Sequence, residues 1–294
     1  MPTSTFSQIN SFVTYLQQAN PNSLLDIGVG NGKLGFIARD LLDVMLGERF
    51  RKRDWKITID GIEVFPDYIQ DHQKAIYDEI HIGDAFDVID TLGAYDLIVV
   101  GDVLEHFEKT RALKFLDKCV AHCNKHVIIS IPLGENWTQP AVYGNPYEEH
   151  LSFWRKEEFE PFADQKNYVT FPGIGLYGTY LINKEDYILS KAWEQFDGLC
   201  AAGRQEEAFL LMETVLWELP ASPKNDFSRA EFFLKQNKIE QAVNQLNQVK
   251  EKFPEYAPVA ADYINKLSGL LADKTFEAYA RKVNGSPLLP DPRL

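Results

Sequence analysis

Apolar, β-branched residues occur in short runs, separated by helix-like segments, over about the first 183 residues of the chain. Within the runs Val, Ile and Leu follow one another instead of alternating with polar residues, which is typical of parallel strands buried on both faces. Strands are expected over residues 23–28, 56–62, 79–82, 95–100 and 126–131, and helices over 33–46, 67–77 and 109–123. Strands interleaved with helices of this length predict an α/β fold, in which right-handed crossovers build a mostly parallel, Rossmann-like sheet.

After residue 131 this regular alternation ends. A loop rich in glycine, proline and aromatic residues extends to about residue 153, and a loop of this length inside a compact domain is typically functional when it is ordered. A helix is then expected over 155–162, and strands over 167–171 and 178–182. The Gly-rich turn between these two strands predicts that the sheet ends in an antiparallel terminal hairpin.

From about residue 184 onward only helical patterns remain. Helices are expected over 186–202, 205–219, 226–237, 239–253 and from 257 into the 280s. Two similar hexads, 203–208 and 237–242, each open a helix and lie 34 residues apart, which is the period of a tetratricopeptide repeat. The sequence therefore predicts two domains: an α/β domain over 1–185, and a small all-helical C-terminal domain over 186–294 that resembles tetratricopeptide repeats.

The acidic excess of the chain restricts the classes of partner. There are 30 Lys and Arg against 43 Asp and Glu, a net charge of −13, whereas a nucleic-acid binder needs clustered cations. Three cysteines make no disulfide framework, and Cys119 and Cys123 are expected to be buried thiols, so no metal is predicted. The first residues lack the layout of a signal peptide, and no apolar run approaches 18 residues. These features predict a cytoplasmic protein with neither a nucleic-acid nor a membrane partner.

The first strand leads into a glycine-rich turn with the sequence Leu24-Leu-Asp-Ile-Gly-Val-Gly-Asn-Gly-Lys-Leu-Gly35. Gly28, Gly30 and Gly32 let the backbone bend sharply and let a ligand approach the main chain. In open parallel sheets, ligands bind beyond the carboxyl ends of the strands. The same glycines also fit a dinucleotide fingerprint, so a nicotinamide-dependent oxidoreductase is an alternative at this point.

Acidic residues lie at the ends of three successive predicted strands: Asp26, Glu63 and Asp84. One such residue is commonly a turn former or a helix cap, but three together indicate a shared ligand. With these acids and the glycine turn, the chain resembles the class I S-adenosylmethionine-dependent methyltransferases (EC 2.1.1.-) over about residues 20–183. The expected antiparallel hairpin is a further likeness to that family.

The resemblance implies S-adenosylmethionine as the cofactor and gives each residue a role. Asp26 and the glycines would line its methionine end, and Glu63 would accept hydrogen bonds from both ribose hydroxyls. Asp84 would bind the adenine amino group, with Ala85 leaving room for the ring. Gly101, in the Gly-Asp-Val-Leu-Glu-His turn after the fourth strand, would belong to the floor beneath the sulfonium.

Histidines close to the expected acceptor suggest how a proton could be removed from an attacked hydroxyl. His150, in the loop after the fifth strand, is the expected base, and His106 is the second candidate. The alternative is structural: His150 hydrogen-bonds a loop and His106 caps a helix. Glu105 or Glu149 is expected to be an orienting carboxylate, and both are expected among the substrate-binding residues. An aromatic lid over the acceptor is expected from Trp137, Tyr143, Tyr147 and Trp154.

The sequence thus predicts a methyltransferase that acts on a small polar acceptor, such as a sugar or another hydroxyl compound. Gly32 and Glu63 are 31 residues apart, against roughly 20 in a dinucleotide site, which disfavours the NAD-dependent oxidoreductase. A second alternative is a non-catalytic scaffold with the cofactor fold. A protein partner, or self-association, is expected to use the helical tail.

Overall fold

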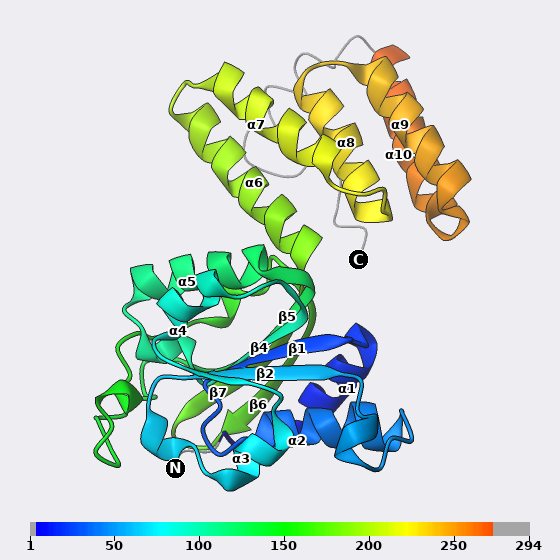
Figure 1. Ribbon diagram of the computed structural model, residues 1–294. Coiled ribbons are helices and arrows are strands. Elements are labelled where there is room, and N and C mark those ends of the chain that lie inside the picture. Colours follow the sequence, from blue (N-terminus) through cyan, green and yellow to red (C-terminus); the bar gives the residue numbers. More distant parts are fainter. Residues whose placement is uncertain (1–3, 273–294) are drawn as a thin grey trace. The chain divides into compact units, whose positions relative to one another are not determined.

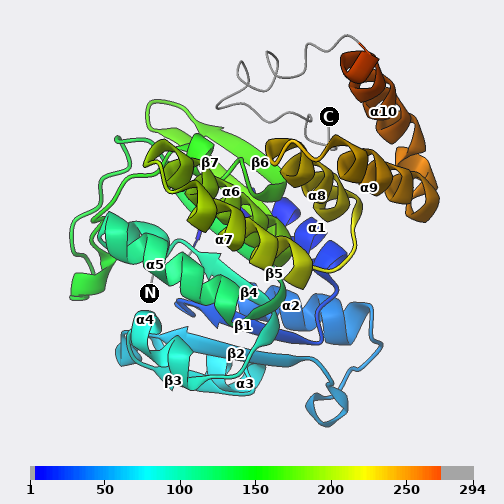
Figure 2. The same cartoon turned by 90° about the horizontal axis from the view of Figure 1, so that it is seen from above.

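The computed structural model of the chain describes residues 4–272, which form two compact units that divide between Tyr187 and Ile188 (Figure 1). The first unit contains a seven-stranded sheet with the strand order β3-β2-β1-β4-β5-β7-β6. Its strands are β1 (Ser23–Ile27), β2 (Thr58–Glu63), β3 (Ile80–Ile82), β4 (Tyr95–Gly101), β5 (Cys123–Leu133), β6 (Ala163–Phe171) and β7 (Gly175–Asn183). Figure 2 shows β3 at one edge of the sheet and the β6–β7 hairpin at the other.

The first five strands are parallel and the last pair is not. Strand β1 pairs in parallel with β2 and β4, and the parallel part extends through β3 and β5. Strand β7 is antiparallel to both of its neighbours, β5 and β6. This topology confirms the predicted mostly parallel, Rossmann-like sheet with an antiparallel terminal hairpin. The chain order reverses between β1 and β4, so their carboxyl ends border the crevice where ligands of such sheets bind.

Helices cover both faces of the sheet. They are α1 (Ile9–Ala19), α2 (Lys33–Arg39), α3 (Asp71–Ile76), α4 (Ala85–Val88) and α5 (Lys109–Ala121). In Figure 1, α4 and α5 lie on one face, and α2 and α3 on the other. Helix α2 continues directly into a π-helical segment, Asp40–Met45, so the predicted helix at 33–46 is helical over nearly its whole length.

Helix α1 is not among the elements expected from the sequence. Its side chains Phe12, Tyr15 and Leu16 are buried in one cluster with Leu24 of β1 and Leu97 of β4. Apolar residues three and four positions apart in this segment are the pattern of an amphipathic helix. The signal was therefore present in the sequence, ahead of the first predicted strand.

The helix expected over 155–162 is absent, and the segment has only a short 3₁₀ turn, Lys156–Glu158. Trp154 and Phe159 are buried with their ring centroids 5.1 Å apart, and Phe159 also packs on Tyr180 of β7 at 4.8 Å. The expected range ends directly before β6, which begins at Ala163, so β6 takes up none of it. Aromatic packing against the hairpin therefore determines the conformation of this segment.

The described part of the second unit is helical, as the sequence predicts. Its helices are α6 (Lys184–Ala201), which starts in the first unit, α7 (Gln205–Glu218), α8 (Pro223–Lys235), α9 (Ile239–Lys252) and α10 (Ala257–Ala272). The predicted continuation of the last helix into the 280s lies outside the described residues. Between residues 4 and 272, none of the helices has the length and apolar character that crossing a membrane requires.

The two similar hexads of the helical tail have equivalent local geometry. Gly203 and Asn237 follow α6 and α8, and both are left-handed, with φ of 75° and 59°. Ala208 and Ala242, at the other end of each hexad, are completely buried. The 34-residue repeat in the sequence is thus also a repeat of local structure. The likeness to tetratricopeptide repeats stays a prediction.

Candidate functional site

A cavity of about 540 Å³ lies in the first unit, at the carboxyl ends of β1, β2 and β4. The predicted site residues that line it are Asp26, Gly28, Gly30, Glu63, Asp84, Ala85, Gly101, Glu105, His106, Trp137, Tyr147 and His150. Gly32, Glu149 and Trp154 lie outside its lining. The fold therefore gathers most of the predicted residues, from segments far apart in the sequence, around one space.

The glycine turn has the backbone conformation that only glycine adopts without strain. Gly28, Gly30 and Gly32 all have positive φ, at 76°, 48° and 75°. A Cβ atom on Gly28 would also stand 2.7 Å from Cγ2 of Val103 in the turn after β4. The amide of Gly28 donates to the carbonyl of Ile62 at 2.9 Å, which ties the turn to β2. Gly32 shapes the turn as the residue that precedes α2, without reaching the cavity.

Glu63 accepts a backbone hydrogen bond through each of its carboxylate oxygens, and one of these bonds comes from the glycine turn. Oε2 accepts from the amide of Gly30 at 2.8 Å, and Oε1 accepts from the amide of Phe65 at 2.9 Å. Burial raises the pKa of the side chain despite these hydrogen bonds. Each carboxylate oxygen has a further lone pair, so Glu63 can still accept hydrogen bonds from a ligand in the cavity.

Asp26 is the most deeply buried of the three strand-end acids, with 2% of its surface exposed. The Tyr77 hydroxyl donates to its Oδ2 at 2.5 Å, while Oδ1 makes no hydrogen bond within the described structure. Burial raises the pKa of Asp26 to about 7. A buried, unpartnered oxygen beside the cavity is a suitable acceptor for a cationic donor on a ligand.

Asp84 has two partners within the protein. Its Oδ1 accepts from the amide of Phe86 at 2.9 Å and caps α4, so the helix-cap role considered from the sequence is present. Its Oδ2 accepts from Arg111 of α5 at 2.8 Å. Arg111 also lines the cavity, and its guanidinium lies over the rings of Phe86 and Phe107. The sequence analysis missed Arg111, because nothing in the local pattern of α5 links it to the strand after which Asp84 lies.

The turn after β4 contains a residue, Asp102, whose backbone is also held in a left-handed conformation. Asp102 has φ of 54°, a left-handed conformation that is uncommon outside glycine. Its carboxylate accepts from the Tyr177 hydroxyl of β7 at 2.5 Å, and burial raises its pKa. A Cβ atom on the preceding Gly101 would stand 2.8 Å from Cδ1 of Leu34, which favours glycine there. Asp102 and Tyr177 line the cavity and were not predicted as site residues.

Glu105, His106 and His150 meet at one side of the cavity. The two imidazole centroids are 5.0 Å apart in an edge-to-face arrangement. His106 Nδ1 lies 3.1 Å from the carbonyl of Glu149, and His150 Nδ1 lies 2.7 Å from the carbonyl of Trp137. The structural alternative thus holds for His150, which bonds to a loop carbonyl, whereas the N-cap of α5 is Glu108 and not His106. Burial lowers the pKa of His106, which favours its neutral form.

In the loop after β5, Glu148 is buried and Glu149 is exposed, although the sequence analysis selected Glu149. Glu148 Oε1 accepts from the Tyr68 hydroxyl at 3.1 Å and from Asn145 Nδ2 at 3.3 Å. The short 3₁₀ turn Pro146–Glu148 directs the side chain of Glu148 inward. Only the backbone carbonyl of Glu149 takes part in the site, through His106.

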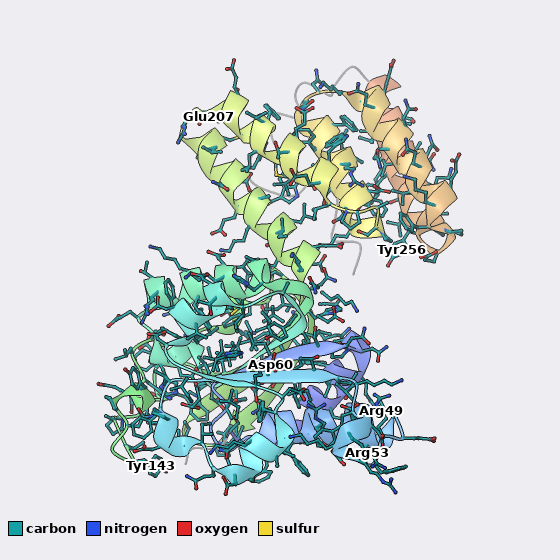
Figure 3. All side chains as sticks on the ribbon, viewed as in Figure 1. Arg49, Arg53, Asp60, Tyr143, Glu207 and Tyr256 are labelled. Carbon is teal, nitrogen blue, oxygen red and sulfur yellow. The ribbon has the colours of Figure 1, made fainter. Side chains whose placement is uncertain are left out.

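The predicted aromatic lid divides into lining, rim and core residues. Trp137 lines the cavity, and Tyr147 and Tyr143 lie at its exposed rim; Tyr143, labelled in Figure 3, is 69% exposed. Trp154 is only 1% exposed, and its indole N–H donates to Ser152 Oγ at 3.1 Å. The structure therefore places Trp154 in the core of the first unit and not against an acceptor.

Comparison with known proteins gives one family and a set of similar folds. Residues 4–170 match the model of a family described as a methyltransferase domain. Similar solved structures include magnesium protoporphyrin IX methyltransferase from Synechocystis PCC 6803 with bound SAH (12% identity, 62% of this chain and 89% of that chain, TM-score 0.43). They also include human N-acetylserotonin methyltransferase in complex with SAM (17% identity, 60% of this chain and 51% of that chain, TM-score 0.40). A third is the N-methyltransferase NodS from Bradyrhizobium japonicum WM9 (15% identity, 60% of this chain and 97% of that chain, TM-score 0.41). Among curated proteins, the comparison gives no match.

Proposed function

Since the chain belongs to the methyltransferase domain family, whose model covers residues 4–170, we propose that it transfers a methyl group from S-adenosylmethionine to a small polar acceptor, such as a sugar or another hydroxyl compound. The observation that carries this proposal is the single cavity shared by the glycine turn, the three strand-end acids and the two histidines. When bound, S-adenosylmethionine supplies a methyl group on a sulfonium leaving group, so the protein contributes mainly by positioning the reactants.

The donor side of the cavity suits the parts of that cofactor. Gly28 and Gly30 have no side chains, so the cofactor can come close to the backbone of the turn at these two positions. Asp26 offers its unpartnered Oδ1 to the cationic amino group of the methionine end. The carboxylate of Glu63 can accept hydrogen bonds from the ribose hydroxyls. The carboxylate of Asp84, beside the small Ala85, can accept one from the adenine amino group.

The acceptor side contains the groups that would bind and deprotonate a hydroxyl. The carbonyls of Trp137 and Glu149 can only accept hydrogen bonds, so the Nδ1 atoms of His150 and His106 carry the protons. Nε2 is then the basic nitrogen of each neutral ring, and it can take a proton from the acceptor. We assign His150 as this base and His106 as the second candidate. Glu105, Trp137 and Tyr147 would contact the acceptor.

The helical unit is proposed to serve a different purpose. The matched left-handed turns at Gly203 and Asn237 and the matched buried Ala208 and Ala242 support a likeness to tetratricopeptide repeats. Repeats of this kind stack into extended surfaces that bind other proteins or a second copy. A cytoplasmic location also stays a proposal, in keeping with three free cysteines.

A panel of variants tests both sides of the cavity. Titration calorimetry with S-adenosylhomocysteine should show that Glu63→Gln weakens binding by about 1.5–3 kcal/mol, because an amide nitrogen cannot accept the hydrogen bonds made by the carboxylate. The matched control is Glu108→Gln, an exposed side chain that makes no cap hydrogen bond, and its affinity should equal that of the wild type. Equal affinity in a folded Glu63→Gln variant would refute the assignment of the donor side.

Transfer of a labelled methyl group to a panel of small hydroxyl compounds tests the acceptor side in the same proteins. His150→Ala should bind S-adenosylhomocysteine like the wild type and lose turnover, because its side chain lies beyond the donor half of the site. Retained turnover would assign the base role to His106 or to no residue. Tight cofactor binding by the wild type without transfer to any acceptor would favour the non-catalytic scaffold.

A further inference from the structure

Glu105 is a buried acid with one unpartnered carboxylate oxygen in the described structure. Its side chain is 2% exposed, and its Oε2 makes no hydrogen bond. Asp102 and Glu148 add further negative charge close to this buried side chain. A buried carboxylate in such surroundings is costly unless a cation or a hydrogen-bond donor offsets its charge.

The two histidines beside Glu105 are oriented in the same way. Each ring uses Nδ1 for a hydrogen bond to a loop carbonyl, of Glu149 for His106 and of Trp137 for His150. Metal-binding histidines typically donate one ring N–H to a carbonyl or carboxylate, which fixes the tautomer and leaves the other nitrogen for the metal. Nε2 is that other nitrogen in both rings.

The ligand-type atoms of these side chains converge. One atom each from Glu105, His106 and His150 lies within 4.8 Å of the other two. We propose that these three residues form a binding site for a divalent transition-metal cation at the acceptor side of the cavity. Two imidazole nitrogens and one carboxylate oxygen are a donor set used for zinc and other first-row metals, with coordination positions left open for a further ligand. Magnesium and calcium prefer oxygen ligands and fit this set less well.

The inference deepens the proposed function, and its catalytic consequence rests on that function. In the transfer, the acceptor oxygen bonds to the methyl carbon while the carbon–sulfur bond breaks, sulfur keeps the electron pair, and the hydroxyl proton passes to water. A cation held by Glu105 and the histidines would lower the pKa of the acceptor hydroxyl and fix its direction. In the metal-bound protein, His106 and His150 would act as ligands, and water would accept the proton of the acidified hydroxyl in place of His150.

Cobalt(II) is a suitable probe, because its visible absorption reports the coordinating atoms. We expect full-length, tag-free wild-type protein to bind one Co²⁺ per chain with a visible absorption band, and Zn²⁺ to displace it. Glu105→Gln and His150→Gln should each bind at least about 100-fold more weakly, since loss of a partner behind a ligand already costs 10–100-fold. Zn²⁺ should raise the melting temperature of the wild type and leave that of Glu105→Gln unchanged.

Matched controls separate this site from general metal binding. Glu108→Gln changes an exposed acid three residues from Glu105, and His122→Gln changes a histidine that lies near Asp90, away from the cavity. Both should bind Co²⁺ like the wild type. Circular dichroism without metal verifies that each variant is folded. Absence of a stoichiometric Co²⁺ complex in the wild type, or equal binding by folded Glu105→Gln and His150→Gln, would overturn the proposal.

Calorimetry with S-adenosylhomocysteine on the same samples distinguishes the two proposals. Cofactor binding without Co²⁺ binding would overturn the metal site and leave the methyltransferase assignment intact. Co²⁺ binding that depends on Glu105 and His150, without cofactor binding, would support the metal site and refute the donor-side assignment. Both kinds of binding are the expected result.

Discussion

Buried carboxylates are the main feature of the site at the scale of single residues. Asp26, Glu63 and Glu105 are all buried, and burial raises the pKa of each of them. Their surroundings differ, because Glu63 has two backbone amide donors, Asp26 has one hydroxyl donor, and Glu105 has an oxygen without a partner. The carboxylates that are least compensated inside the protein are the ones we assign to cationic ligands.

The raised pKa of Asp26 predicts a pH-dependent affinity for the cofactor. Its pKa is about 7 in the folded protein, against about 3.9 in an unfolded chain. Between about pH 4 and pH 7, Asp26 is therefore protonated in the folded protein and ionised in the unfolded chain. Folding stability from this group is therefore fully present below about pH 4 and is lost as the pH rises through about 7. The ionised form binds the cofactor amino group, so S-adenosylhomocysteine affinity should fall roughly tenfold for each pH unit below 7.

Calorimetry between pH 5.5 and pH 8.5 checks this expectation. The control is Asp26→Asn, which keeps an acceptor for the Tyr77 hydroxyl but has no charge to titrate, so its affinity should be weaker and nearly independent of pH. Glu63, whose negative charge contributes to the raised pKa of Asp26, is present in both proteins. An equal slope in the wild type and in Asp26→Asn would assign the pH dependence to another group.

At the scale of elements, the ends of helices and strands carry the constrained backbone positions. Gly28 directly follows β1 in a left-handed conformation, and a Cβ atom there would clash with Val103 in the turn after β4. Gly203 is also left-handed, after α6, but a Cβ atom there would have no neighbour within 4 Å. Gly198, inside α6, has equally open surroundings and no left-handed φ. Two glycines five residues apart therefore differ only in the backbone conformation that they must adopt.

This difference predicts opposite effects of the same substitution. Gly203→Ala should lower the free energy of unfolding by about 1 kcal/mol, because alanine is strained at φ of 75°. Gly198→Ala should raise it by about 0.5–1 kcal/mol, since glycine inside a helix costs that much relative to alanine. Urea unfolding of both variants measures the two values, and shifts of the same sign would contradict the assigned conformations.

At the scale of the whole molecule, the chain divides into two compact units with separate cores. The cavity and all its lining residues belong to the first unit, and the residues of the two helical clusters belong to the second. A ligand that binds only the native first unit stabilises that unit by mass action, by about 2.7 kcal/mol at a hundredfold excess over its Kd.

Scanning calorimetry of the full chain should therefore show two transitions. S-adenosylhomocysteine is expected to raise the midpoint temperature of one transition and to leave that of the other unchanged within error, because no described residue of the second unit lines the cavity. A single transition that moves as a whole would show that the units unfold as one cooperative block.

Local patterns in the sequence determined the framework of the protein. Continuous apolar runs predicted the buried parallel strands, the glycines predicted the left-handed turn after β1, and the turn at 172–175 predicted the terminal hairpin. These features depend on the conformational preferences of neighbouring residues, which the sequence states directly. The acids at the strand ends followed from the same framework, because parallel strands bring their carboxyl ends to one edge of the sheet.

Tertiary structure alone decided which side chains face one another. It turned Glu148 inward instead of Glu149, buried Trp154 in the core, and joined Arg111 to Asp84. It also brought the side chains of His150, Glu105 and His106 within 4.8 Å of one another. The sequence placed all three near the acceptor, but their direct contact depends on a fold that joins segments more than 40 residues apart. The physical reason is that these contacts depend on the packing of elements distant along the chain, and a one-residue change of turn geometry reverses which side chain enters the cavity.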